Sequence, residues 1–120
     1  MGKNNESGAW GEAVAARFLK RKRYKIITTN YRCRFGEIDI IAANKQFLVF
    51  VEVKTRKNDR FAEAAEFVDI YKQNRLRSTA ELYLAGNPTQ LQPRFDVIEI
   101  YAPSGIETKR PEINHLEDVF

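Results

Sequence analysis

The segment that most constrains the fold runs from Phe35 to Lys57 and reads FGEIDIIAANKQFLVFVEVKTRK. It predicts a β-hairpin with strands near Gly36–Ala43 and Phe47–Thr55, joined by a turn at Asn44-Lys45. Valine, isoleucine and phenylalanine dominate both strands, so we expect the hairpin to be buried on at least one side, within a larger sheet. Charged side chains are nevertheless embedded in it, at Glu37, Asp39, Glu52 and Lys54. Burying a charge is costly unless the charge is paired or binds a metal.

Strand alternation predicts where these charges lie relative to one another. Glu37 and Asp39 share one face of the first strand, and Glu52 and Lys54 share one face of the second. If the loop has an even number of residues, all four fall on the same face, and Asp39 lies about 5–8 Å from Glu52. Two carboxylates at that distance repel, and a divalent cation such as Mg²⁺ removes the conflict. The alternative is an ordinary cross-strand ion pair on a solvated face.

Length and composition indicate one small globular domain. We expect residues 1–120 to form a single core, with about residues 1–6 frayed. The net charge of +4 suits a polyanionic partner but does not prove one. The single Cys33 excludes an internal disulfide and favours a reduced, cytoplasmic setting. No apolar run approaches the length of a membrane span, so we expect no membrane association.

A first helix is predicted from Ser7, a good N-cap residue, to about Arg23. Its Glu12 projects only about 20° from Leu19 around the helix axis, inside the apolar sector. Glu12 is therefore either an acid at the edge of the stripe, where a helix N-terminus favours it, or a carboxylate aimed at the acidic hairpin. With the hairpin in view, we favour the second interpretation. The basic run over residues 20–25 is either a solvated helix C-terminus or a phosphate contact.

The remaining segments complete the order α-β-β-β-α-β, with the carboxylates on the central hairpin. We predict a strand over residues 24–34 and a charged loop over residues 56–67. A helix follows over residues 69–84, and another strand over residues 94–101. Asp69 is the expected N-cap of the second helix. We also expect an edge strand near Ile106–Ile113, which leaves His115 exposed in a short tail without a role.

Basic and amide side chains surround the predicted acidic face. Lys72 and Gln73 lie one turn before Leu76 on the core side of the second helix, so both could reach the hairpin and contact phosphate. Glu37 is either an outer ligand of the metal or a partner of Lys54. Further basic residues would add sequence-independent affinity for a nucleic-acid backbone: Arg32, Arg34, Arg56 and Lys57.

Phosphodiester hydrolysis is the chemistry that these residues could perform. Asp39 and Glu52, with the carbonyl of Val53, could hold Mg²⁺ or Mn²⁺, which polarises phosphate and acidifies water. Lys54 shares the face of Glu52, so it could orient that water or neutralise charge on the phosphate. Glu12 could hold a second ion or a water molecule. No Cys-His combination or glycine-rich phosphate loop points to another mechanism.

These motifs also carry a resemblance. Gly36-Glu37-Ile38-Asp39 lies ahead of Glu52-Val53-Lys54, with thirteen residues from Asp39 to Glu52, and resembles the D…(D/E)xK signature of the PD-(D/E)xK nuclease superfamily. Ile38 stands where the name-giving pattern has proline. Five segments together resemble the YraN-like family over nearly the whole chain from Gly11 to Phe120: GEAVAARFL, YRCRFGEIDIIA, FLVFVEVKTR, KQNRLRSTAELYL and RFDVI. The resemblance implies an α/β, restriction-endonuclease-like core with a mixed central sheet.

The YraN-like family is related to Holliday-junction resolvases, which cut branched DNA as dimers. The resemblance implies that Glu12 is a helix-borne acid, Asp39 and Glu52 are metal ligands, and Lys54 is the catalytic lysine. We therefore expect a Mg²⁺- or Mn²⁺-dependent endonuclease that acts on branched or flapped DNA in preference to RNA, as a homodimer. Two alternatives stay open. One is a nucleic-acid-binding module that cuts little or nothing, and the other is an interaction domain whose hairpin charges are only ion-paired.

Overall fold

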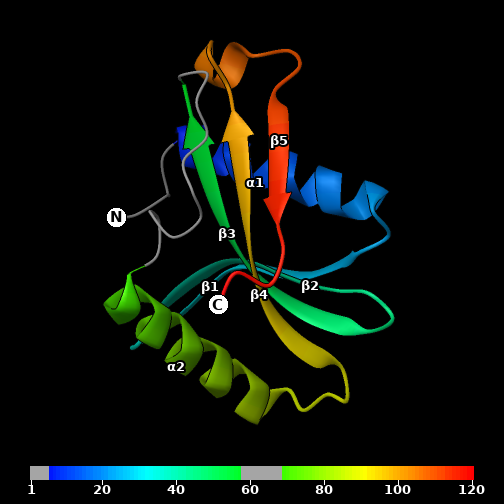
Figure 1. The fold of residues 1–120 in the computed structure, drawn as a ribbon, viewed down its shortest axis with the longest axis vertical. Coiled ribbons are helices and arrows are strands. Elements are labelled where there is room, and N and C mark those ends of the chain that lie inside the picture. Colours follow the sequence, from blue (N-terminus) through cyan, green and yellow to red (C-terminus); the bar gives the residue numbers. More distant parts are fainter. Residues whose placement is uncertain (1–5, 58–68) are drawn as a thin grey trace.

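The computed structural model describes residues 6–57 and 69–120 and shows a mixed sheet with two α-helices (Figure 1). In chain order the elements are α1 (Glu6–Arg21), β1 (Lys25–Cys33), β2 (Gly36–Ala43), β3 (Phe47–Arg56), α2 (Ile70–Gly86), β4 (Gln92–Tyr101), the 3₁₀ turn η2 (Gly105–Glu107) and β5 (Glu112–Leu116). The strands described form one sheet in the order β1-β2-β3-β4-β5. Only β3 and β4 among these neighbours run parallel. The predicted order α-β-β-β-α-β is confirmed, and β5 follows it.

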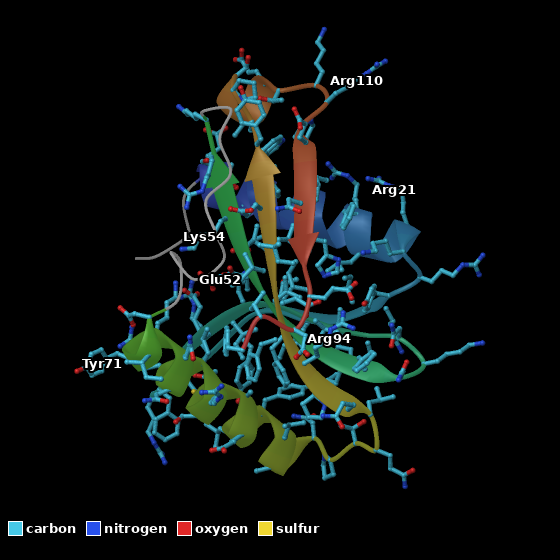
Figure 2. All side chains as sticks on the ribbon, viewed as in Figure 1. Arg21, Glu52, Lys54, Tyr71, Arg94 and Arg110 are labelled. Atoms are coloured by element: carbon cyan, nitrogen blue, oxygen red, sulfur yellow. The ribbon has the colours of Figure 1, made fainter. Side chains whose placement is uncertain are left out.

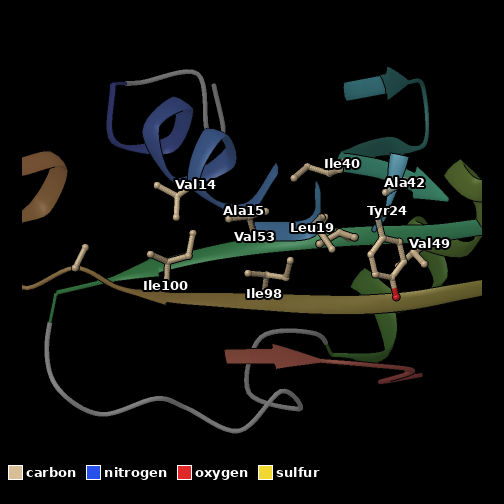
Figure 3. Close-up of a cluster of buried hydrophobic side chains, with 12 residues drawn as sticks. Val14, Ala15, Leu19, Tyr24, Ile40, Ala42, Val49, Val53, Ile98 and Ile100 are labelled. Carbon is tan, nitrogen blue, oxygen red and sulfur yellow. The ribbon is translucent and has the colours of Figure 1, made fainter. Parts of the chain in front are cut away.

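The two helices cover opposite faces of the sheet. On β3, residues at odd positions such as Val51 pack in the cluster under α1, whereas Leu48 and Phe50 pack in the cluster under α2. Figure 3 shows Val14, Ala15 and Leu19 of α1 resting on Val53, Ile98 and Ile100 of the central strands. On α2, the apolar residues Leu76, Ala80 and Tyr83 are buried against the sheet. The central strands are therefore buried on both faces, which explains their nearly continuous apolar sequence.

The turn between β2 and β3 lies one residue later than predicted. The Asn44 N–H donates to the Phe47 carbonyl at 3.1 Å, so the two turn residues are Lys45 and Gln46. The Asn44 Oδ1 accepts hydrogen bonds from the N–H groups of Gln46 and Phe47 at 2.9 and 2.7 Å, which is the side-chain capping that favours asparagine in turns. The loop still has an even number of residues, because Ala43 pairs with Leu48. The predicted parity of the hairpin is therefore confirmed.

β2 and β3 separate partway along the hairpin. Their register pairs run from Ala43 and Leu48 to Ile40 and Val51 and end there. The first half of β2 continues beside β1 alone, and a two-stranded ribbon twists more strongly than a full sheet. Ile38 accordingly packs under α2, although strict alternation would place it with Ile40 under α1. We call the place where the two strands part, beside Asp39, the β2–β3 notch.

The chain after β4 differs from the prediction. The expected edge strand at Ile106–Ile113 is wrong, because β5 spans Glu112–Leu116 and η2 precedes it. Pro111 has no N–H to donate, so strand pairing begins only after it. His115 is consequently a strand residue with a side chain only 3% exposed, and the prediction of an exposed tail histidine is wrong.

The two α-helices follow the expected signals in part. Ser7 is not the N-cap of α1, because the helix already includes Glu6, and α1 ends at Arg21 and not at Arg23. The Asp69 side chain caps α2 by accepting a hydrogen bond from the Lys72 N–H at 2.8 Å, as predicted. Neither α1 nor α2 is long and apolar enough to cross a membrane. The expected loop at 56–67 lies outside the described residues except for Arg56 and Lys57, and the expected frayed end at 1–6 does so except for Glu6.

Candidate active site

Asp39 lies where β2 leaves β3, and it is fixed to the backbone of β3. Its side chain is buried, with 1% of the residue exposed, and its Oδ2 accepts a hydrogen bond from the Val53 N–H at 2.8 Å. In a strand the N–H and C=O of one residue point to the same neighbour, so the Val53 carbonyl also faces this notch. Continuing the hairpin register by one step places Asp39 opposite Glu52.

Glu52 points to the side of the sheet that α2 covers. It is 7% exposed and borders a small cavity whose apolar lining includes Ile38, Phe50 and Leu76. Its Oε2 accepts a hydrogen bond from the Lys72 Nζ at 2.9 Å and lies 3.3 Å from the Lys54 Nζ. A carboxylate in such surroundings needs opposite charge nearby, and the two ammonium groups supply it. Figure 2 shows Glu52 and Lys54 close together near the centre of the molecule.

Glu12 approaches β3 from the other face of the sheet. It is 6% exposed on α1, so its predicted inward orientation is confirmed. The expected aim at the acidic face of the hairpin is not what the structure shows, because α1 covers the face opposite the one toward which Glu52 points. The preceding Gly11 lies directly against the Thr55 side chain of β3. Within residues 6–57 and 69–120, however, no three or more histidine, cysteine, aspartate or glutamate side chains gather closely enough to hold a metal ion. Glu12, Asp39 and Glu52 therefore do not form a preassembled three-carboxylate site.

The donors at the β2–β3 notch fit a hard divalent cation in kind. Asp39, Glu52 and the Val53 carbonyl all offer oxygen, and Mg²⁺ is commonly held by one or two carboxylates together with waters and phosphate oxygens. Mn²⁺ accepts the same donors. Because Glu52 is in contact with two ammonium groups, an ion would have to compete with Lys54 and Lys72 for this carboxylate.

The predicted phosphate-binding residues are spread around this centre. Lys72 reaches this centre directly, through its contact with Glu52. Gln73 lies half-buried in the first turn of α2, beside Lys72. Arg56 is the last residue of β3, and its Nε lies 3.9 Å from a carboxylate oxygen of Glu99. Lys57 follows β3 directly and is exposed.

Arg32, Arg34 and Glu37 lie farther from the notch, at the β1–β2 end of the sheet. The Arg32 Nε donates to the Glu37 Oε2 at 2.9 Å, and the two residues are a cross-strand register pair. Of the two roles considered for Glu37, the pairing with Lys54 is not what the structure shows. The Arg34 guanidinium lies 4.7 Å from the ring centroid of Phe35 in the turn between the strands.

Glu99 is an acidic neighbour of the site that the sequence analysis missed. It is fully buried on β4, and the parallel register pairs it with Lys54. Its Oε1 accepts a hydrogen bond from the Asn114 Nδ2 at 3.0 Å. The alternation of RFDVIEIY sets Glu99 on the face opposite Ile98, but only the pairing of β4 with β3 brings it beside Lys54.

A second buried polar cluster, also missed, surrounds Asp96 on the α1 side. Asp96 accepts hydrogen bonds from the Arg94 guanidinium at 2.8 and 2.9 Å, from His115 Nε2 at 2.7 Å and from the Asp118 N–H at 3.0 Å. Burial by itself raises the pKa of Asp96, but these hydrogen bonds outweigh it and hold the pKa below its usual value. Hydrogen bonding to Asp96 likewise raises the pKa of Arg94, so both charges are stable and structural.

A mixed sheet of this order, with helices on both faces and an acidic notch between β2 and β3, defines a restriction-endonuclease-like α/β core. The chain belongs to Uncharacterised protein family UPF0102, whose model matches residues 11–100. This confirms the resemblance to the YraN-like family.

Individual relatives align with this chain over nearly their whole length. A UPF0102 protein of Caldanaerobacter subterraneus subsp. tengcongensis is 44% identical over 115 residues, which cover 94% of this chain and 93% of the relative. One from Nocardia farcinica is 44% identical over 122 residues, covering 100% and 93%, and one from Alkaliphilus oremlandii is 42% identical over 120 residues, covering 98% and 99%.

Proposed function

We propose that this chain is a Mg²⁺- or Mn²⁺-dependent endonuclease that hydrolyses phosphodiester bonds in DNA, with branched or flapped DNA as its preferred substrate. The observation that carries the proposal is the hydrogen bond between Asp39 and the Val53 N–H. Because Glu52 and Lys54 flank Val53 in sequence, this bond holds an acid beside an acid-x-lysine segment at the notch. DNA as substrate and the lone Cys33 both fit a cytoplasmic enzyme.

Each residue at the notch has a distinct role in this proposal. Asp39, Glu52 and the Val53 carbonyl would hold the ion, which when bound polarises the phosphate and acidifies water. The Val53 N–H orients the Asp39 carboxylate. The Lys54 ammonium is held beside Glu52, where it would orient the attacking water or neutralise charge that develops on the phosphate.

Residues outside the notch would position the substrate. Lys72, which contacts Glu52, and the next residue, Gln73, lie in the first turn of α2 and would contact phosphate. Glu12 would hold a second ion or a water molecule from the α1 side. Contacts with the sugar–phosphate backbone would add affinity independent of sequence, from Arg32, Arg34, Arg56 and Lys57. The resemblance to junction resolvases supports a homodimer, which sedimentation velocity would detect.

Cleavage of a substrate panel tests the proposal. We expect the wild-type protein, with Mg²⁺ or Mn²⁺, to cut flapped or four-way DNA faster than linear duplex, single strands or matched RNA. Asp39→Asn and Lys54→Gln should each lower the cleavage rate about 100-fold or more, because the first removes a charged ligand of the ion and the second removes a positive charge beside the reacting phosphate. Glu81→Gln, an exposed change on α2, is the matched control and should cut normally. Activity that persists in Asp39→Asn would exclude this site as its source.

A nucleic-acid-binding module with the same fold is the second candidate. It is favoured by the engagement of Glu52 with two lysines and by the lack of a three-ligand group in the described part of the chain. This candidate predicts salt-dependent DNA binding in EDTA, with no cleavage of any substrate in the panel when Mg²⁺ or Mn²⁺ is added.

A further inference from the structure

We propose that a basic pocket at the far end of the β2–β3 hairpin from Asp39 is a second binding site for the phosphate backbone of nucleic acid. The pocket is lined by Lys22, Arg23, Asn44, Lys45 and Gln46. It is formed where α1 ends and β2 turns into β3, two segments that Figure 1 shows on the same side of the molecule. The register pair of Lys25 with Ala43 brings them together. The inference rests on the proposed function for the identity of its ligand.

The backbone at Arg23 is the first argument for a binding role. The Tyr24 N–H donates to the Leu19 carbonyl and the Arg23 N–H to the Lys20 carbonyl, both at 3.0 Å, which is the Schellman pattern at a helix end. Arg23 occupies the left-handed position of that motif with φ 72°, where glycine is usual because it has no Cβ to clash. An arginine retained in a strained conformation points to a function for its side chain.

The charges in the pocket are the second argument. Among the residues that the structure describes, the side chains of Arg23 and Lys45 form no ion pair or hydrogen bond, and both are exposed. The Asn44 Oδ1 accepts hydrogen bonds from the turn, so the other polar group of this side chain, the Nδ2 amino group, is a donor. Two cations and an amide donor around one hollow are suited to an anion with several oxygens.

Lys22 is held at the edge of the pocket by the cluster around Asp96. Its Nζ lies 2.8 Å from His115 Nδ1 and 3.7 Å from a Glu117 carboxylate oxygen. An ammonium group can only donate, so Nδ1 accepts and the neutral imidazole carries its proton on Nε2, which donates to Asp96. The buried network therefore orients one wall of the pocket.

Nucleic acid fits this surface better than an anionic membrane. Peripheral membrane binding normally uses apolar side chains that enter the interface. The exposed large apolar residues of the described chain lie elsewhere, at Ile27, Phe35, Ile70, Tyr71, Leu82 and Ile106. Glu52 is five strand residues from Phe47, where β3 begins after the turn, so about 17 Å of strand separates the candidate active site from the turn that lines the pocket. A nucleic-acid strand with a phosphate about every 3.4 Å along the duplex axis would span that distance in about five steps.

Arg23→Gly separates a binding role from a structural one, because the two predict changes of opposite sign. Removing the strained Cβ should raise the melting temperature by a few degrees, about the size expected for a relieved left-handed residue. Removing the cation should weaken binding to a labelled duplex of about 20 base pairs several-fold and make the slope of log affinity against log salt shallower by about 1. Both are measured in EDTA, by thermal denaturation and by fluorescence anisotropy.

Two matched controls complete the experiment. Asn30→Gly relieves another left-handed residue, with φ 54° on β1, and should leave duplex binding unchanged. Lys45→Gln should weaken duplex binding, whereas Lys109→Gln, an exposed lysine before β5, should do so much less. The proposal is overturned if Arg23→Gly binds duplex as tightly as wild type, if Lys109→Gln matches Lys45→Gln, or if wild type binds phosphatidylserine vesicles but no duplex.

The outcomes distinguish this pocket from the proposed activity. If the pocket proposal fails alone, wild type cuts DNA and Arg23→Gly binds duplex normally. If the activity proposal fails alone, Arg23→Gly loses duplex binding while wild type cuts no substrate.

Discussion

At the scale of single residues, Glu52 has a carboxylate for which a metal ion and two lysines would compete. Its carboxylate is a proposed metal ligand, yet Lys72 lies 2.9 Å and Lys54 3.3 Å from the same oxygen. Among the described residues, Asp39 and Glu52 contribute two negative formal charges at the notch, and Lys54 and Lys72 contribute two positive ones. Lys72 therefore competes with a cation for Glu52, and it would become available to phosphate when a cation binds.

We expect Lys72→Gln to tighten Mn²⁺ binding about 3- to 10-fold, because a positive charge beside the ligand carboxylate disfavours a second cation. Isothermal titration calorimetry of the protein alone, without DNA, measures this directly. Lys109→Gln removes the same charge from a distant loop and should leave Mn²⁺ affinity unchanged. Unchanged or weaker binding in Lys72→Gln would show that Glu52 is not the ligand.

At the scale of elements, the approach of α1 to β3 depends on Gly11. A Cβ built on Gly11 would collide with the Thr55 Oγ1, and the Val53 side chain lies next in line. The bare backbone thus lets α1 lie flat across β3 and carries Glu12 to the face of the sheet behind the notch. A helix without this glycine would be displaced from the strand that bears Glu52 and Lys54.

Gly11→Ala should therefore destabilise the protein by about 1–3 kcal/mol through overpacking. In a Thr55→Ala background the same change should be neutral or stabilising by up to about 1 kcal/mol, because the clash is gone and alanine favours helix over glycine. Urea denaturation of the four proteins in this double-mutant cycle measures both values. Equal effects of Gly11→Ala in the two backgrounds would show that the helix does not rest on Thr55.

At the scale of the whole molecule, the cluster around Asp96 ties together segments that are distant in sequence. The Arg94 guanidinium donates hydrogen bonds both to Asp96 and to the Tyr24 hydroxyl, whose oxygen lies 2.7 Å from Arg94 Nη2. Tyr24 directly precedes β1. His115 of β5 and the backbone of Asp118 bind the same carboxylate. The edge strand β5 is thus connected to the buried centre of the sheet through the Asp96 carboxylate.

This cluster makes stability depend on pH. The pKa of Asp96 is lower in the folded protein than its ordinary value of 3.8. Its contribution is therefore complete above that value and is lost as the pH falls through the lower folded pKa. Asp96→Asn should lower the free energy of unfolding at pH 7 by about 3–5 kcal/mol, because Arg94 is left buried without its partner.

Between pH 5 and pH 3, wild type should lose more stability than Asp96→Asn. Urea denaturation at pH 7, 5 and 3 measures the difference in unfolding free energy between the two proteins. The contributions of the carboxylates that both proteins share cancel in this difference. Parallel pH curves for the two proteins would contradict the assignment.

The parts of the fold that follow from local pattern are the parts that the sequence determined. The period of two and an even turn define the hairpin and predict that Asp39 lies near Glu52. The observed turn at Lys45-Gln46 sets the register that places the two residues opposite each other. The Asp69 cap defines the start of α2, and apolar spacing defines both helices and the inward direction of Glu12. These features depend on neighbours a few residues apart, so they can be read from the chain alone.

Tertiary structure alone decided how distant segments meet at the site. The separation of β2 from β3 beyond Ile40, the contact of Lys72 with Glu52, and the burial of Glu99 and His115 all depend on partners far away in sequence. Pairing of β3 with β4 and of β4 with β5 satisfies backbone hydrogen bonds that any strand could satisfy, so local pattern does not specify it. The local sequence thus determines which acidic residues lie on strands, whereas the packed sheet determines which charges surround them.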